Sequence, residues 1–278
     1  DNTAYAAGPV LGQFPTVWNV PAGQVAGPRH ANETYEGWLG QVLTRENDAD
    51  QGPDQDGPNN ILRSAGGAIG DVADLDRGDD GWLNRNITFF DCREQTLKVR
   101  VSKAAGATKN RMYLNVWFDG NRDGDWQDIS PCKPDEDSPK QASYEWIVQD
   151  YVVDMTAIPA GGYLDFKVDT ELVYNPKLYE DVWMRFSLSE DRAVQPNDAE
   201  YPDGRGPHPS DAKPSFEFGE TEDVMRTARP SAGEDGTLKL EKRVVTESDV
   251  VGYAGQATYE IRSVSYTHLT LPTNGCVG

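Results

Sequence analysis

Several kinds of residue are scarce in this sequence, and each shortage excludes a class of protein. No stretch is apolar over the length of a membrane span, so we expect no membrane insertion of this chain. The 26 lysines and arginines face 46 aspartates and glutamates, a formal net charge of −20. This charge repels nucleic acid and anionic lipid, so the expected partners are cations. Neither His30 nor His208 lies beside a nucleophile-bearing motif, so we expect no enzyme.

Cysteine is also scarce, with three residues in 278. Cys92 and Cys132 lie in the body of the chain and Cys276 lies near its end. One interpretation is a disulfide between Cys92 and Cys132 in an exported protein. The other is a pair of free buried thiols, so the cysteines alone leave the compartment open.

The sequence does contain repeated strand-like alternation. Hydrophobic residues make up 37% and aromatic residues 10% of the chain, enough for a packed core. Alternating apolar and polar residues predict strands over residues 87–90, 96–102, 111–118, 151–155, 163–170 and 182–188. No long stretch has helical periodicity. The pattern predicts an all-β protein, an antiparallel β-sandwich of the jelly-roll or immunoglobulin-like type with long Asp/Gly-rich loops.

The most informative stretch follows the strand predicted at 111–118. It carries oxygen-bearing side chains at alternate positions around a glycine, Gly124. These predicted ligands are Asp119, Asn121, Asp123, Asp125 and Asp128. Such side chains converge on one hard cation when a glycine lets the backbone turn tightly, so the pattern indicates Ca²⁺.

The loop differs from an EF-hand in two respects. It leaves a strand rather than a helix, and its twelfth position is Ser130 in place of the bidentate glutamate. The closing carboxylate must therefore come from Asp125, from Asp128 or from an acid in a distant segment. The alternative is an Asp/Gly-rich hairpin without a metal. A further acidic segment, residues 45–81, carries ten carboxylates and three arginines, and is either metal-bound or a solvated loop.

Three motifs together resemble one known family. They are LNVWFDGNRDGDWQD at 114–128, WMRFSLS at 183–189 and FEFGETEDV at 216–224. The chain from residue 29 to 227 resembles the GEVED domain of bacterial extracellular and cell-surface proteins, although Thr221 and Val224 depart from the usual Val and Tyr. The resemblance implies a secreted or cell-surface location in a bacterium.

The closing motif crowds Glu220, Glu222 and Asp223 into four positions, which is costly unless the carboxylates are solvated, hydrogen-bonded or metal-bound. We expect Glu220 or Asp223 to approach the Asp119 loop as a further ligand. In an extended segment Glu220 and Glu222 share one face and Asp223 points to the other. The alternative is that these acids protect a sheet edge from pairing.

The expected domain organisation has five parts. Residues 1–28 form a leader or loosely packed segment, 29–228 the GEVED-like sandwich and 229–236 a linker. Residues 237–263 resemble the start of the immunoglobulin-like surface repeats called domain of unknown function 11, and we expect a truncated repeat. Residues 264–278 contain VSYTHLTLPT, which resembles a translated sequencing adapter, so we expect an artefactual tail; the alternative is a genuine terminal strand.

These observations predict a non-catalytic extracellular module that binds structural calcium within a larger bacterial surface or adhesion-type protein. That larger chain is expected to meet a surface glycan or a protein ligand. A carbohydrate-binding module is the main alternative, with Trp38, Trp82 and Trp146 as candidate stacking platforms. A glycoside hydrolase is less favoured, because acids are so abundant here that a carboxylate pair proves little.

Overall fold

The computed structural model describes residues 18–19, 25–43, 78–178, 180–226, 239–244 and 259–264. The chain divides into two compact units, Asp1–Ala228 and Arg229–Gly278, and the division falls where the linker is predicted. The predicted linker lies outside the described residues, as do most of the predicted leader, most of the predicted tail and most of the acidic segment at 45–81. Every regular element in the described residues is a β-strand.

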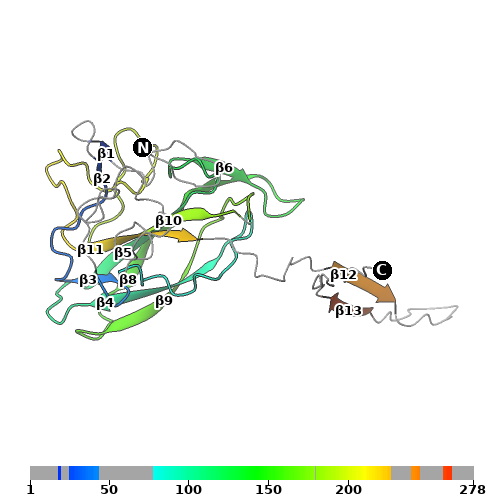
Figure 1. Ribbon diagram of the computed structural model, residues 1–278, viewed down its shortest axis with the longest axis horizontal. Coiled ribbons are helices and arrows are strands. Elements are labelled where there is room, and N and C mark those ends of the chain that lie inside the picture. Colours follow the sequence, from blue (N-terminus) through cyan, green and yellow to red (C-terminus); the bar gives the residue numbers. More distant parts are fainter. Residues whose placement is uncertain are drawn as a thin grey trace, which may run out of the picture. The chain divides into compact units, whose positions relative to one another are not determined.

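Two antiparallel sheets form the body of the first unit, and they face each other in Figure 1. The larger sheet has the order β11 (Gly219–Arg226), β10 (Val182–Ser189), β5 (Arg111–Phe118) and β8 (Trp146–Asp154). The smaller sheet has the order β3 (Gly37–Leu39), β4 (Thr96–Lys103) and β9 (Tyr163–Asp169). Two short pairs accompany them, β1 (Trp18–Asn19) with β2 (Val25–Ala26) and β6 (Ile129–Cys132) with β7 (Gln141–Tyr144). The predicted all-β sandwich is confirmed.

The hydrophobic core lies between the two sheets. The apolar faces predicted from alternation are buried in it: those of β4 (Leu97, Val99, Val101), β5 (Leu114, Val116, Phe118) and β10 (Val182, Met184, Phe186, Leu188). Trp82 stacks on Phe186 with ring centroids 5.4 Å apart. Burying this many apolar side chains is the main stabilising term, at about 25 cal/mol per Å² removed from water.

The outer face of β10 is buried as well. Trp183, Arg185 and Ser187 are at most 5% exposed although they alternate with the core residues. The long segment after β10 covers this face, since Arg185 Nη1 donates to the carbonyl of Gly204 at 2.9 Å. This covering brings the 190–218 segment against the loop that follows β5.

The strand predicted at residues 87–90 is not present. Phe89 packs in the core, but the backbone around it bonds to side chains instead of a neighbouring strand. Asn175 Nδ2 donates to the Phe89 carbonyl at 2.7 Å, and Arg226 Nη2 donates to the Ile87 carbonyl at 2.7 Å. The alternation of apolar residues at 87–90 therefore reflects the burial of Phe89, but these residues do not pair with a neighbouring strand.

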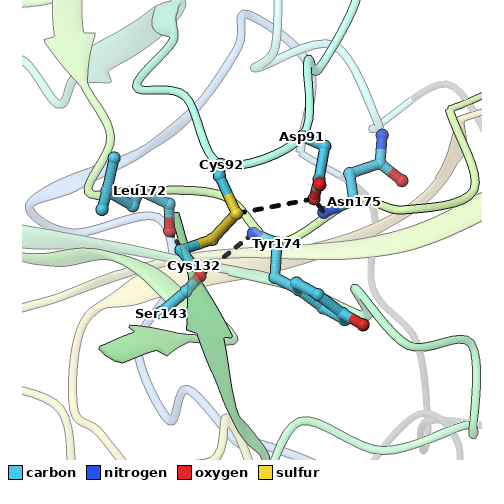
Figure 2. The surroundings of a disulfide bond; sticks show 7 residues. All are labelled: Asp91, Cys92, Cys132, Ser143, Leu172, Tyr174 and Asn175. Carbon is cyan, nitrogen blue, oxygen red and sulfur yellow. Dashed lines mark hydrogen bonds between the residues drawn. A yellow bond between two sulfur atoms is a disulfide. The ribbon is translucent and has the colours of Figure 1, made fainter. Parts of the chain in front are cut away.

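Cys92 and Cys132 form a disulfide, so the disulfide interpretation is the one the structure supports. Figure 2 shows it beside Ser143, whose hydroxyl donates to the Leu172 carbonyl at 2.6 Å. Asp91 also lies against the two sulfurs, but sulfurs joined to each other are not free to ligate a metal. The bridge links the segment before β4 to the end of β6.

The second unit contains β12 (Lys239–Val244) and β13 (Tyr259–Val264). They pair antiparallel, with Leu240 opposite Ser263 and Val244 opposite Tyr259. The assignment of this unit to an immunoglobulin-like repeat stays a prediction.

Among the described residues, no helix is long and apolar enough to cross a membrane.

Candidate metal centre

The loop between β5 and β6 curls around its first aspartate. Asp119 is fully buried, and its Oδ1 accepts hydrogen bonds from the backbone N–H of Arg122 at 2.7 Å and of Asp123 at 3.2 Å. Its Oδ2 accepts from Gly124 N at 3.1 Å. Gly124 has a φ of 93°, a conformation that glycine adopts without steric cost. The sequence pattern thus forms the tight turn that a cation-binding loop needs.

Three predicted ligands converge. Asp123, Asp125 and Asp128 each offer a carboxylate oxygen, and these oxygens lie within 4.8 Å of one another. The amide of Asn121 lies with them, because its Nδ2 donates to Asp123 Oδ2 at 2.7 Å and to Asp128 Oδ2 at 2.6 Å. The Asn121 amide nitrogen thus lies between two carboxylates that repel each other. A bound cation would occupy the same position between them.

A fourth carboxylate, Glu145, comes from a distant segment that sequence reasoning did not name. It lies between β7 and β8, is 4% exposed and accepts from Gly120 N at 2.9 Å and from Asp128 N at 3.3 Å. Its own backbone is joined to both ends of the loop, since Phe118 N donates to its carbonyl at 2.8 Å. Glu145 is therefore a candidate for the closing acid that was expected from a distant segment.

The electrostatics of the cluster favour a bound cation. Burial, followed by the hydrogen bond that protonated Asp123 donates to Asp128 and by the charge of Asp125, raises the pKa of Asp123 to about 7. Burial and then the charges of Asp119, Asp123 and Asp128 raise the pKa of Glu145 well above its ordinary value. Burial also raises the pKa of Asp125. Crowded, desolvated carboxylates either bind protons or bind a metal, and a divalent ion removes the cost of the charged form.

The nearby arginines neutralise other acids. Arg205 forms ion pairs with Asp203 and Asp198, each at 2.7 Å. Between residues that the structure describes, no ion pair with lysine or arginine involves Asp123, Asp125, Asp128 or Glu145. Ion pairs with lysine or arginine therefore do not compensate these four carboxylates, and a proton or a cation has to do so.

The two predicted ligands from the closing motif lie elsewhere. Asp223 pairs with Arg185 through two contacts, at 2.7 Å to Nε and 2.6 Å to Nη2. Glu220 accepts from Leu39 N at 2.9 Å, and burial, followed by the charge of Glu222, raises its pKa well above its ordinary value. The expected approach of Glu220 or Asp223 to the Asp119 loop is not seen among these contacts. The cause is the register of β11, which turns Glu220 toward the smaller sheet and Asp223 toward Arg185.

Two of the three aromatic candidates for sugar stacking, Trp82 and Trp146, are engaged in packing, whereas Trp38 is half-buried. Trp82 is 2% exposed. Trp146 stacks on Trp117 and donates from Nε1 to Asn115 Oδ1 at 2.9 Å. Asn115 also forms part of the floor of a small cavity beneath the 190–218 segment, lined by Ser187, Ser189 and Gly204 among others. Because the polar groups of that floor are already hydrogen-bonded, they offer little to a sugar hydroxyl.

The contact between Ser210 and His208, two of the described residues, belongs to a local turn. Ser210 Oγ lies 2.6 Å from His208 Nδ1, while Asp211 accepts from the backbone N–H of His208. A catalytic triad needs the acid on the imidazole, to orient it. Asp211 does not fill that role.

Comparison of the chain with protein-family models, with curated proteins and with solved structures found no match.

Proposed function

We propose that the loop at residues 119–128 and Glu145 bind one calcium ion, and that the protein is a non-catalytic calcium-binding module. The observation that carries this proposal is the meeting of three carboxylates within 4.8 Å with a buried glutamate from another segment. Asp119 shapes the loop, Asp123, Asp125 and Asp128 supply carboxylate oxygens, and Glu145 closes the site. Asn121 would supply its amide oxygen after its side chain turns, because its Nδ2 faces the carboxylates in this structure.

Calcium is the cation that this donor set favours. All the side chains involved present oxygen, and Ca²⁺ takes six to eight oxygen ligands in flexible geometry. Magnesium demands a stricter octahedron and retains several waters. A loop with several carboxylates and a distant glutamate supports the larger ion.

The role of the ion is structural. Bound at this point, it would join the β5–β6 loop to the start of β8 through Glu145. The hydroxyl of Tyr201 donates to the Asp128 carbonyl, so the 190–218 segment is connected to the same loop. A cation that fills the cluster therefore stabilises the connections between strands.

The wider setting follows from the disulfide and the resemblance. A disulfide is typical of exported proteins, and the motifs at 114–128, 183–189 and 216–224 resemble the GEVED domain. We place the module in a secreted or cell-surface bacterial protein of the adhesion type, whose larger chain would contact a glycan or protein ligand.

The test is calcium uptake and calcium-dependent stability. The wild-type protein should take up calcium in equilibrium dialysis, and its melting temperature should rise with calcium, since a ligand at 100 times its Kd stabilises by about 2.7 kcal/mol. Asp123→Ala and Glu145→Gln should each abolish or weaken the shift. Both variants should remain folded in chelator, because each removes a repelling buried charge.

Asp165→Ala is the matched control, because Asp165 is an acid on β9 paired with Arg100. It should keep the full calcium shift. Absence of uptake by the wild type at millimolar calcium would refute the proposal. A glycan-array signal that persists in chelator would favour sugar binding instead.

A further inference from the structure

Arg122 stands between two proposed ligands of the metal loop and is 4% exposed. Its backbone has a φ of 64°, in the left-handed region that non-glycine residues seldom adopt. Its guanidinium returns to the first turn of the loop, where Nη1 donates to the carbonyl of Gly120 at 2.7 Å and to that of Asp119 at 3.1 Å. The side chain thus fixes the backbone from which the ligands on both sides of it project.

The same guanidinium reaches a second segment, the one that precedes β10. Nη2 donates to Asn175 Oδ1 at 2.7 Å, and Nε donates to the Asp181 carbonyl at 2.9 Å. Asn175 is 1% exposed, and its own Nδ2 donates to the carbonyl of the core residue Phe89 at 2.7 Å. Arg122 therefore anchors the loop to a part of the chain that is fixed by the hydrophobic core.

The loop lies tightly against that segment. A Cβ at Gly120 would come within 2.3 Å of the Tyr174 carbonyl oxygen, so only glycine permits this approach. Five hydrogen-bond donors in a planar fork suit a guanidinium to bridging several carbonyls at once, which a lysine ammonium cannot reproduce.

Without a cation the loop is under electrostatic strain. Asp123, Asp125 and Asp128 bring carboxylate oxygens within 4.8 Å of one another, and the repulsion between their charged forms would open an unsupported loop. A buried positive charge that is bonded to the loop backbone opposes the opening. The ligands then stay close together before the metal arrives.

We propose that Arg122 is a positioning residue for the metal site, which holds the loop in its ligand-ready conformation through Asn175. This inference rests on the proposed calcium site. Loss of Arg122 should weaken calcium binding although no ligand is removed. Residues that orient metal ligands typically contribute about 10- to 100-fold to metal affinity.

The experiment compares Arg122→Met, Arg122→Lys and Arg226→Met with the wild type. Arg226 is the matched control, because its guanidinium also donates to a backbone carbonyl, that of Ile87 at 2.7 Å, and lies 5.7 Å from the Phe89 ring. Calcium affinity is measured by titration calorimetry. Terbium luminescence decay in H₂O and D₂O counts the waters on a lanthanide bound in the site.

Arg122→Met should bind calcium about 10- to 100-fold more weakly and should leave more waters on terbium. Arg122→Lys should recover part of the affinity, and Arg226→Met should match the wild type. Asn175→Ala removes the acceptor for Arg122 together with the hydrogen bond to the Phe89 carbonyl. It should weaken calcium binding in the same direction, which keeps the test valid if Arg122→Met does not fold.

The positioning role would be overturned if Arg122→Met bound calcium with wild-type affinity and left the wild-type number of waters on terbium. It would also be overturned if Arg226→Met lost as much calcium affinity as Arg122→Met. Either result would leave the calcium site intact. A wild type that binds neither ion would refute the calcium site itself, and with it this inference.

Discussion

His30 connects the chain before β3 to the closing motif. Its Nδ1 lies 3.0 Å from the Phe218 carbonyl and its Nε2 lies 2.9 Å from Thr221 Oγ1, so the ring donates to the carbonyl and accepts from the hydroxyl in its neutral form. The ring also stacks on Phe216. Burial lowers the pKa of His30 to about 4, against weaker opposing effects of the Phe218 carbonyl, Glu190 and Glu33.

This arrangement predicts a pH-dependent loss of stability. The imidazole of the unfolded chain titrates near 6.5, so between pH 6.5 and 4 the unfolded chain binds a proton that the folded chain does not. The stability is complete above pH 6.5 and falls as the pH drops toward 4. We expect a loss on the order of 1 to 2 kcal/mol by pH 5, because the ring keeps some solvent contact.

The measurement is urea unfolding at pH 8, 6 and 5 for the wild type and His30→Gln. The stability difference between the two proteins should change between pH 6 and 5, whereas other titrating groups affect both equally. Parallel pH profiles would contradict the role given to His30.

At the scale of the elements, β10 and β11 are joined by more than their ladder. Arg185 is fully buried and pairs with Asp223, whose side chain is 10% exposed, across the register of the two strands. Arg185 also lies 4.7 Å from the ring of Trp126, in the metal loop. The pair therefore links the closing motif, the central strand and the site.

We expect Asp223→Ala to destabilise the protein by about 3 to 5 kcal/mol, because it leaves a buried guanidinium without its carboxylate. Asp165→Ala is the matched comparison on β9, since its pair with Arg100 is partly exposed and should be worth about 1 kcal/mol or less. Denaturant unfolding of both variants measures the difference. Similar losses in the two would show that burial of the Arg185 pair has little effect.

The alternation of apolar and polar residues was sufficient to predict which side chains of β4, β5 and β10 face the core, because every second side chain of a strand points to the same face. It did not predict the burial of polar side chains on the opposite face of β10. Arg185 is buried by the 190–218 segment, whose path depends on contacts far apart in sequence, such as that of Trp117 Nε1 with the Pro202 carbonyl at 3.0 Å.

The convergence of Asp123, Asp125 and Asp128 was predictable for a similar reason, because these proposed ligands are local in sequence. Glu145 was missed because it comes from a segment 25 positions away from Gly120, and only the fold brings the two together. A signal did exist: a single acid between Tyr144 and Trp146 at the start of an apolar strand must be buried, and a buried acid needs a partner.

At the scale of the whole molecule, the disulfide and the proposed metal site act on the same connection between β5 and β6. Cys132 ends β6, close after the loop. The disulfide spans 40 positions, and closing a loop of this size is expected to stabilise by about 4 kcal/mol through the entropy of the unfolded chain. The proposed metal would act on the folded state, by binding it.

The loop is anchored independently of the disulfide. The β6–β7 ladder pairs Ile129 with Tyr144, and Glu145 N donates to the Asp128 carbonyl at 3.2 Å. Tyr201 holds the same carbonyl from the 190–218 segment. The ligands should therefore keep their positions when the disulfide is removed.

We therefore predict that the two stabilising effects are additive. Replacing both cysteines, Cys92→Ala with Cys132→Ala, should lower the free energy of unfolding by about 4 kcal/mol and leave the calcium-induced increment unchanged. The measurement is denaturant unfolding in calcium and in chelator, with Cys276→Ala in both proteins to prevent thiol exchange. A calcium increment that vanishes with the disulfide would mean that the bridge also positions the ligands. If the rise in the free energy of unfolding caused by calcium is unchanged, the disulfide stabilises by restricting the unfolded chain and the metal stabilises by binding the native loop.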